Sequence, residues 1–269
     1  YRIDEGHEVF ASYAENMAMF QGGFKLGPQS VSQAVWDAQG QYLKPETSKS
    51  FDVGYRYVGD TLQVSAAAYD VKFENRLLQY NPCPTNQQQN PGCGNSFHNA
   101  GSVTSKGAEL GVLWKPLSWL NWYNSASYNK STYDEDLNWC TTTCVVKKTA
   151  GKQQVDTPKE MFASVVSVKR GPFSASLQGK YTGRRYYTYT NDQSFGGYTT
   201  FDLGLAYRFD QVGVMKGAKA SLNITNLTFE RYASNVDSSV FAPDDAAGSI
   251  LVFHSSAPRQ IFATIGFDF

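Results

Sequence analysis

The sequence predicts an all-β protein that crosses a membrane as an antiparallel β-barrel. Three observations favour this fold class: about ten segments alternate apolar with polar residues, short and long connections take turns, and the polar faces carry charges at mid-strand. The 269 residues contain no run of about 18 apolar residues, which excludes a transmembrane helix. A barrel needs apolar residues only at every second position, so a hydrophobic fraction of 41% is compatible with it.

Composition also limits the partners. The chain has 24 basic and 24 acidic side chains, hence zero net charge, and it has no basic run. Nucleic acid is therefore not expected as a partner. The first residues, "YRIDEGHEVF", lack the basic stretch followed by an apolar stretch that marks a signal peptide. We therefore expect any signal peptide to precede the sequence given.

The first five predicted strands alternate with a period of two. Their apolar faces are Val9, Ala11 and Tyr13; Phe51, Val53, Tyr55 and Tyr57; Tyr69, Val71 and Phe73; Ala108, Leu110, Val112 and Trp114; and Leu120, Trp122, Ala126 and Tyr128. In the third of these strands Leu62 and Val64 occupy the opposite phase. A bulge among the intervening alanines, or a middle without preference, would reconcile the two halves.

Five more strands complete the predicted set. Their apolar faces are Phe162, Val166 and Val168; Phe173, Ala175, Leu177 and Tyr181; Phe201, Leu203, Leu205, Tyr207 and Phe209; Ala220, Leu222 and Ile224; and Ile261, Ala263, Ile265, Phe267 and Phe269. In the last strand the apolar face continues to Phe269. In a barrel this face meets lipid, and the strand closes against a first strand so that no edge remains.

The connections are sorted by length. The short ones cover about 58–61, 115–119, 169–172 and 210–218, and the long ones about 18–46, 80–101, 131–157, 188–197 and 233–257. Outer-membrane barrels have short periplasmic turns and long extracellular loops. Aromatic residues gather toward strand ends, where girdles meet the lipid headgroups: Tyr55, Tyr57, Trp114, Trp119, Trp122 and Tyr207.

The four cysteines form two local pairs. Cys83 and Cys93 lie in "PCPTNQQQNPGC", and Cys140 and Cys144 lie in "WCTTTC". Neither pair has metal-ligand spacing, so we expect no metal site and favour disulfides that close polar loops, with free thiols as the alternative. Disulfides imply an oxidising compartment.

Four stretches of the chain resemble a known family. They are "LKPETSKSFDVGYRY" at 43–57, "NAGSVTSKGAELGV" at 99–112, "SLNITNLTFERY" at 221–232 and "APRQIFATIGFDF" at 257–269. Each is similar to a segment in the C-terminal half of the barrel of TonB-dependent outer-membrane receptors.

The resemblance implies that residues 1–269 are the C-terminal part of a bacterial outer-membrane barrel of about 22 strands with a plugged lumen. The plug domain and the first barrel strands would lie outside this chain. Such a receptor imports a scarce bulky nutrient, most often a ferric siderophore, with energy from the inner-membrane protein TonB acting through the missing plug region. Its other partners would be outer-membrane lipid and the rest of the barrel, and neither catalysis nor a cofactor is expected.

Aromatic and charged residues at the predicted strand tops are candidate ligand contacts. They are Trp36, Phe97, His98, Trp139, Arg184, Arg185, Tyr186, Tyr187 and Tyr189. The alternative interpretation of "GRRYYTYT" at 183–190 is an aromatic girdle whose basic residues face lipid headgroups. Four mid-strand charges are predicted to line the lumen and to pair across the barrel: Arg56, Glu109, Asp202 and Arg208.

Three other interpretations of the sequence are possible, two of another function and one of another fold. A closed ten-stranded barrel enzyme of the protease kind would use loop residues such as His98 and His254 with Asp244 and Asp245. A passive porin would surround open water with the same strands. A soluble β-sandwich would have to cover the apolar faces with a second layer.

Overall fold

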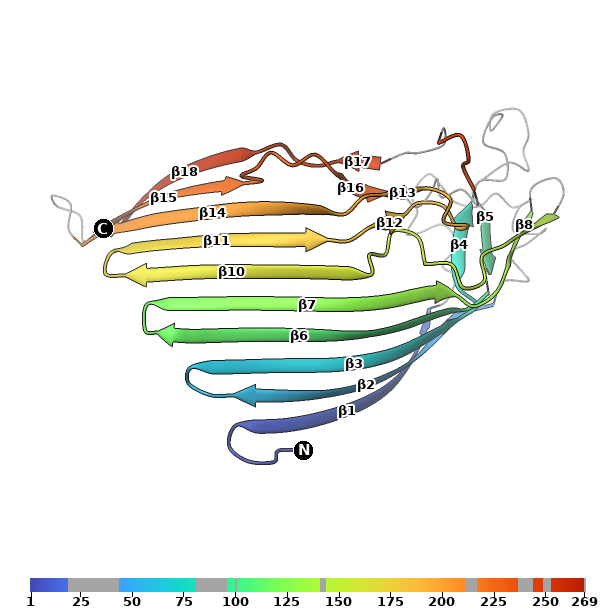
Figure 1. The fold of residues 1–269 in the computed structure, drawn as a ribbon, viewed down its shortest axis with the longest axis horizontal. Coiled ribbons are helices and arrows are strands. Elements are labelled where there is room, and N and C mark those ends of the chain that lie inside the picture. The colour runs from blue at the N-terminus through green and yellow to red at the C-terminus, as the bar shows by residue number, and fades with distance from the viewer. Residues whose placement is uncertain are drawn as a thin grey trace.

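A single antiparallel sheet of ten strands makes up most of the computed structural model (Figure 1). The structure describes residues 1–18, 44–80, 96–99, 101–140, 144–210, 217–236, 244–248 and 253–268. In spatial order the sheet contains β1 (His7–Ala18), β2 (Glu46–Val58), β3 (Leu62–Glu74), β6 (Val103–Leu117), β7 (Leu120–Tyr133), β10 (Glu160–Arg170), β11 (Phe173–Thr182), β14 (Tyr198–Phe209), β15 (Gly217–Thr225) and β18 (Gln260–Asp268). This order follows the chain, as in a meander, and the predicted all-β fold is confirmed.

Four short strand pairs extend the long connections. They are β4 (Leu77–Tyr80) with β5 (Ser96–Asn99), β8 (Leu137–Cys140) with β9 (Cys144–Lys147), β12 (Arg185–Tyr186) with β13 (Ser194–Phe195), and β16 (Ala233–Val236) with β17 (Phe253–Ser255). In Figure 1 the labelled members of these pairs lie to the right of the long strands that they follow, whereas the tight turns between β2 and β3, β6 and β7, and β10 and β11 lie at the left. The predicted sorting of connections by length is therefore confirmed for these hairpins. Among the described residues no helix is long and apolar enough to cross a membrane.

One face of the sheet is apolar along its whole width. Register partners continue this face from strand to strand, for example Val53, Ala68, Ala108 and Tyr128 at one side and Leu177, Leu203, Ile224 and Ile261 at the other. We call it the outer face. Its side chains are open to the surroundings, and Ile265, for example, is 67% exposed. No described residues form a second layer over it, so lipid is the environment that matches it.

The opposite, inner face is polar. The register places Arg56, Glu109, Asp202 and Arg208 on it, in strands β2, β6 and β14. Arg56 lies 3.4 Å from the carboxylate of Glu8 on the neighbouring strand. The pair that the structure shows for Arg56 therefore joins adjacent strands and does not span a lumen.

The predicted assignment of β3 side chains to the two faces is wrong in the half nearer the long connections, from Tyr69 to Phe73. Its register with β2 and with β6 is unbroken from Leu62 to Phe73, so Tyr69 and Phe73 face inward with Asp52 and Val103. Leu62 continues the outer face instead. From Asp70 onward the outer positions of β3 are charged, and Asp70 pairs with Lys106 at 2.8 Å. The apolar Phe73 packs instead against a buried cluster on the inner face.

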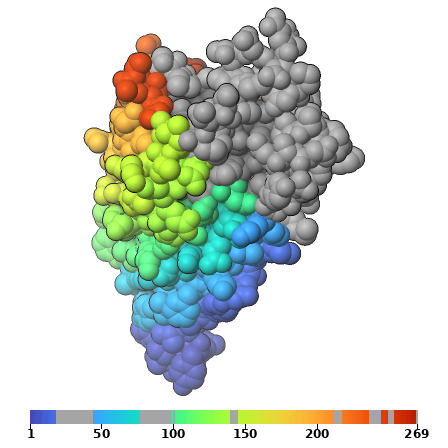
Figure 2. Space-filling view, turned by 90° about the vertical axis from the view of Figure 1, so that its right-hand side faces the viewer, coloured from blue at the N-terminus to red at the C-terminus, as the bar shows by residue number. Residues whose placement is uncertain are grey.

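Figure 2 looks onto the long-loop end of the sheet, with β1 in blue at the bottom and the last strands in orange and red at the top. At this end the inner face carries a buried cluster of Val103, Tyr133, Leu137, Val155 and Tyr189, with Phe73 packed against it. Three of these residues, Phe73, Val103 and Tyr133, are consecutive register partners on β3, β6 and β7. The others come from connections, so loops fold back over the inner face.

Candidate functional site

The candidate site is the set of connections that cover the inner face at the long-loop end. We call residues 149–157, 185–193 and 226–236 the loop collar. These segments follow β7, β11 and β15, which are three different hairpins of the sheet. Because they come from separate hairpins, side-chain contacts must hold them together.

An aromatic pair fastens the collar to the sheet. The rings of Tyr133 and Tyr189 meet edge to face with centroids 5.7 Å apart, and the hydroxyl of Tyr133 accepts a hydrogen bond from the backbone N–H of Val155 at 3.2 Å. Tyr189 is 1% exposed. Burial raises the pKa of the Tyr189 hydroxyl far above its ordinary value.

A reciprocal amide contact joins two collar segments. The side-chain oxygen of Asn191 accepts from the backbone N–H of Gln153 at 2.6 Å, and its side-chain nitrogen donates to the carbonyl of Gln153 at 2.9 Å. Asn191 has a φ of 60°, a left-handed conformation that asparagine tolerates better than most residues. The next residue, Asp192, accepts a hydrogen bond from the backbone N–H of Asp245 at 3.0 Å.

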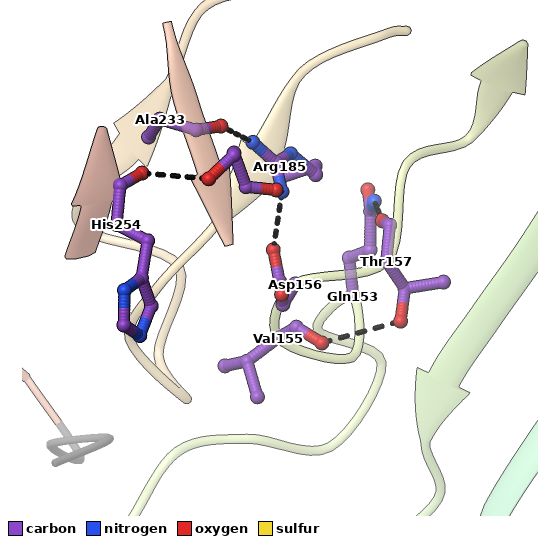
Figure 3. Close-up of polar contacts among 8 residues, drawn as sticks. Gln153, Val155, Asp156, Thr157, Arg185, Ala233 and His254 are labelled. Carbon is purple, nitrogen blue, oxygen red and sulfur yellow. Dashed lines mark hydrogen bonds and ion pairs between the residues drawn. The ribbon is translucent and has the colours of Figure 1, made fainter. Parts of the chain in front are cut away.

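Arg185 joins all three segments (Figure 3). Its guanidinium donates to the carboxylate of Asp156 at 2.7 Å and to the carbonyl of Ser234 at 3.3 Å, and a further bond reaches the carbonyl of Ala233. The arginine side chain is 6% exposed. Both terminal nitrogens of the guanidinium are thus bonded, and its planar fork sets the spacing of the acceptors. Among the described residues the buried Nε of Arg185 has no hydrogen-bond partner.

Asn226 holds the entry to the third segment. Its backbone N–H donates to Asp202 at 2.8 Å, and its side-chain amide bonds Glu230 in both directions and donates to the carbonyl of Ala257 at 3.1 Å. Asn226 also has a left-handed φ of 49°. Asp202, on the inner face of β14, therefore fixes the turn at Asn226.

The predicted ligand contacts divide by burial. Arg185, Tyr187 and Tyr189 are brought together inside the collar, at 5%, 8% and 1% exposure, and Tyr189 offers no surface to a ligand in this arrangement. Arg184 is exposed and Tyr186 is partly exposed. The alternative that the basic residues of "GRRYYTYT" face headgroups is wrong for Arg185, which points into the protein.

The remaining predicted contacts cannot be placed as side chains. Phe97 and His98 belong to β5 and Trp139 to β8, at the long-loop end, but their side chains lie outside the described part of the structure, as does Trp36 altogether.

The cysteine predictions are only partly located. Cys140 and Cys144 are register partners on β8 and β9, while Cys83 and Cys93 lie outside the described residues. Both disulfides stay predictions.

The residues proposed for a barrel enzyme do not converge where the structure describes them. Asp244 pairs with Lys147 at 2.6 Å, Asp245 is 5% exposed, and the carbonyl of His254 accepts from the hydroxyl of Ser234 at 2.9 Å. No described hydrogen bond joins His254 to either aspartate. Within the same residues, no group of three or more His, Cys, Asp or Glu side chains is placed to hold a metal ion.

Sequence reasoning missed Asp156, Asn191 and Asn226, the residues that hold the collar together. A usable signal was present, because all three are Asp or Asn in loops or at strand ends, in "VDTP", "TND" and "TNLT", and these residue types tolerate the left-handed backbone of turns. Asp156, like the two asparagines, has a positive φ, in its case 52°.

Comparison with known proteins gives consistent matches. The family model described as TonB dependent receptor-like, beta-barrel matches residues 1–227. The ferrioxamine receptor of Yersinia enterocolitica is 23% identical over 274 residues, which cover 100% of this chain and 32% of that protein. The chain thus spans about a third of the length of this curated relative.

Solved structures show the same fold. The siderophore receptor PiuA from Acinetobacter baumannii superposes with a TM-score of 0.72 at 18% identity, covering 99% of this chain and 34% of its own. The ferric yersiniabactin uptake receptor FyuA from Yersinia pestis superposes with a TM-score of 0.67 at 19% identity, covering 100% and 36%. At these identities the likeness establishes the fold.

Proposed function

Because the chain belongs to the TonB-dependent receptor-like β-barrel family, we propose that it is the C-terminal part of an active-transport receptor of the bacterial outer membrane. The receptor binds a scarce bulky nutrient at its extracellular end and imports it through a plugged barrel with energy from the inner-membrane TonB system. The rest of the barrel and the plug, which contacts TonB, belong to the part of the protein beyond this chain.

The loop collar is the observation that carries this proposal. An open pore needs a clear mouth, whereas here three connections fold back over the inner face and are fixed by buried contacts from Tyr189 and Arg185. Such a pre-ordered rim suits recognition of a large ligand, because little conformational entropy is lost on binding. The collar thus favours a receptor over a passive porin.

A ferric siderophore is the proposed cargo. The related proteins described above are named for ferrioxamine, for siderophores and for ferric yersiniabactin. Contacts to the cargo are proposed for Arg184 and Tyr186, whose side chains are accessible, and for Trp36, Phe97, His98 and Trp139. Arg185, Tyr187 and Tyr189 support these contacts from within the collar.

The inner-face charges are proposed to support the plug. Arg56, Glu109, Asp202 and Arg208 share the polar face, and Asp202 already anchors the turn at Asn226. We propose that this wall is structural and that cargo choice depends on the loops. A change in cargo selectivity after replacement of Glu109, with normal expression, would contradict this assignment.

Uptake of radioactive iron by cells that carry or lack the full-length receptor tests the function. Iron-starved cells with the receptor should accumulate ferric siderophore, and a protonophore that collapses the inner-membrane gradient should abolish the difference. Uptake that persists without the gradient would favour the porin. An outer-membrane protease activity that disappears in His254→Ala would favour the barrel enzyme.

A further inference from the structure

A short segment in the last long connection contacts two other connections. Residues 244–248 lie between β16 and β17 and form a turn, in which the backbone N–H of Gly248 donates to the carbonyl of Asp245 at 2.9 Å. We call this segment the strap. It contains two aspartates, two alanines and a glycine, so it has little apolar surface to bury and depends on polar contacts.

Two polar contacts hold the strap. The carboxylate of Asp244 accepts a hydrogen bond from the ammonium of Lys147, the last residue of β9, at 2.6 Å. The backbone N–H of Asp245 donates to the carboxylate of Asp192, between β12 and β13, at 3.0 Å. These contacts span 97 and 53 residues of the chain, so the strap ties its own connection to two others.

The strap lies beside Tyr187, one of the predicted ligand contacts. Tyr187 is 8% exposed, its hydroxyl donates to the side-chain oxygen of Gln193 at 3.3 Å, and its ring centroid lies 5.0 Å from that of Phe195. Burial raises the pKa of Tyr187, and the nearby carboxylates of Asp245 and Asp192 raise it further. The carboxylate of Asp245 is therefore close to this tyrosine, and the strap belongs to its cover.

The contact with Lys147 is the weaker end of the strap. The side chains of Lys147 and Asp244 are 24% and 48% exposed, so water screens their attraction. Asp245, at the other contact, is 5% exposed and donates to a charged acceptor, and such hydrogen bonds are stronger than those between neutral groups. Release of the strap therefore begins most easily at Asp244.

We propose that the strap covers Tyr187 in the cargo-free receptor and that cargo displaces it, so that Tyr187 and the adjoining Phe195 become cargo contacts. The proposal rests on the receptor function proposed above. A closed strap and bound cargo exclude each other, so the fraction of receptors with an open strap sets the apparent affinity. The aromatic surface is then offered only to a ligand that replaces the contacts of the strap.

Amide hydrogen exchange of the full-length receptor in detergent tests the displacement. Saturating ferrioxamine should accelerate exchange at the Asp245 amide at least about tenfold, the factor that corresponds to loss of a hydrogen bond to a charged group. The amide of Val155, which donates to the Tyr133 hydroxyl inside the collar, should not accelerate. Slower or unchanged exchange at Asp245 with ferrioxamine bound would overturn the proposal.

Variants at the weaker contact test the competition. Asp244→Asn should accelerate cargo-free exchange at Asp245 about two- to fivefold, as expected for a partly exposed ion pair, and lower the apparent Kd for ferrioxamine by the same factor. The charge swap Lys147→Asp with Asp244→Lys should restore both values. The control Lys148→Gln removes the neighbouring lysine, which pairs with Asp136 at 2.7 Å, and should change neither.

The outcomes separate the strap from the cargo. Unchanged exchange at Asp245 in cargo-free Asp244→Asn would overturn the strap, and faster exchange with an unchanged Kd would overturn its competition with cargo. If ferrioxamine bound to no form of the receptor, the proposed cargo would be wrong, and the cargo-free exchange would still decide how the strap is held.

Discussion

At the scale of single residues, Arg185 is the side chain that links the three segments of the loop collar. Its acceptors, Asp156 and the carbonyls of Ala233 and Ser234, come from the two other collar segments. Sequence reasoning identified Arg185 as important but gave it a ligand. It could not see the partners, because they lie 29 and 48 residues away and nothing in the local pattern links such distant turns.

Removing the Arg185 charge should loosen the collar. Arg185→Gln leaves the Asp156 carboxylate without its cation, and breaking a buried pair costs about 3–5 kcal/mol. Amide hydrogen exchange of residues 149–157 and 233–236 in the full-length receptor should accelerate by roughly a hundredfold, the lower end of that range. Arg185→Lys should not restore protection, because an ammonium lacks the planar fork.

The double variant Arg185→Gln with Asp156→Asn is the control. It removes both charges and should recover part of the protection, since no unpaired carboxylate remains. Unchanged exchange in Arg185→Gln would show that the aromatic cluster and the contact between Asn191 and Gln153 hold the segments without Arg185.

Asp136 precedes β8 and bonds the residues that follow β9, so the stability of this part of the chain depends on pH. Its carboxylate accepts from the Lys148 ammonium at 2.7 Å and from the backbone N–H groups of Thr149 and Ala150 at 3.0 and 3.1 Å. The hydrogen bond from Lys148 is the chief reason that the pKa of Asp136 is lowered below its ordinary value. A carboxyl group with a lowered pKa stabilises the fold at pH values above its pKa in the unfolded state. This stabilisation is lost as the pH falls through its pKa in the folded state.

The segment 134–150 should therefore become sensitive to pepsin as the pH falls below about 4. Asp136→Asn should be sensitive at every pH at which pepsin cuts, because the amide cannot carry the charge. Asp134→Asn, which removes a different carboxylate that accepts from the Thr104 hydroxyl, should keep the transition. A transition that survives in Asp136→Asn would assign it to another group.

At the scale of strands, the pleat made most of the sheet predictable. In β2, β6, β11 and β14 the apolar residues recur at every second position, and the register links them into one continuous outer face. In β3 the run "SAAA" at 65–68 contains no large apolar or charged side chain, so it carried no information on phase. Phe73 then misled the prediction, because it packs against loop residues on the inner face.

Adjacent residues of β11 should respond in opposite ways to the same charge. Leu177 lies on the outer face between Val166 and Leu203, and Ser176 lies on the inner face. Leu177→Lys should lower the free energy of unfolding in lipid vesicles by about 2–4 kcal/mol, the cost of a lysine at mid-bilayer. Ser176→Lys should change it little. Urea titration of the full-length receptor measures both, and equal losses would mean that the assigned faces are wrong.

At the scale of the whole molecule, the sheet has two free edges. Among the described strands β1 pairs with β2 and β18 pairs with β15, and the ten strands form an open row. Unpaired backbone groups at membrane depth cost several kcal/mol each, so both edges require partners in lipid. The matched relatives, about three times as long as this chain, have room for such strands.

Residues 1–269 alone should therefore fail to form a heat-resistant band on unheated denaturing gels after transfer into lipid vesicles. Refolding together with the remaining barrel segment should restore that band, because β1 and β18 then find partners. A stable monomeric band from residues 1–269 alone would indicate a small closed barrel. The rival enzyme would then gain support, with His254 and Asp244 as the residues to replace.

The shared guanidinium also constrains how this protein diversifies. An isolated surface loop can change length at little energetic cost. Here a deletion in 149–157 moves Asp156, and a deletion in 226–236 moves the carbonyls of Ala233 and Ser234. Either change leaves the buried Arg185 without some of its acceptors. These segments are thus expected to change length together or not at all, and tolerated insertions are expected in connections that do not contact Arg185.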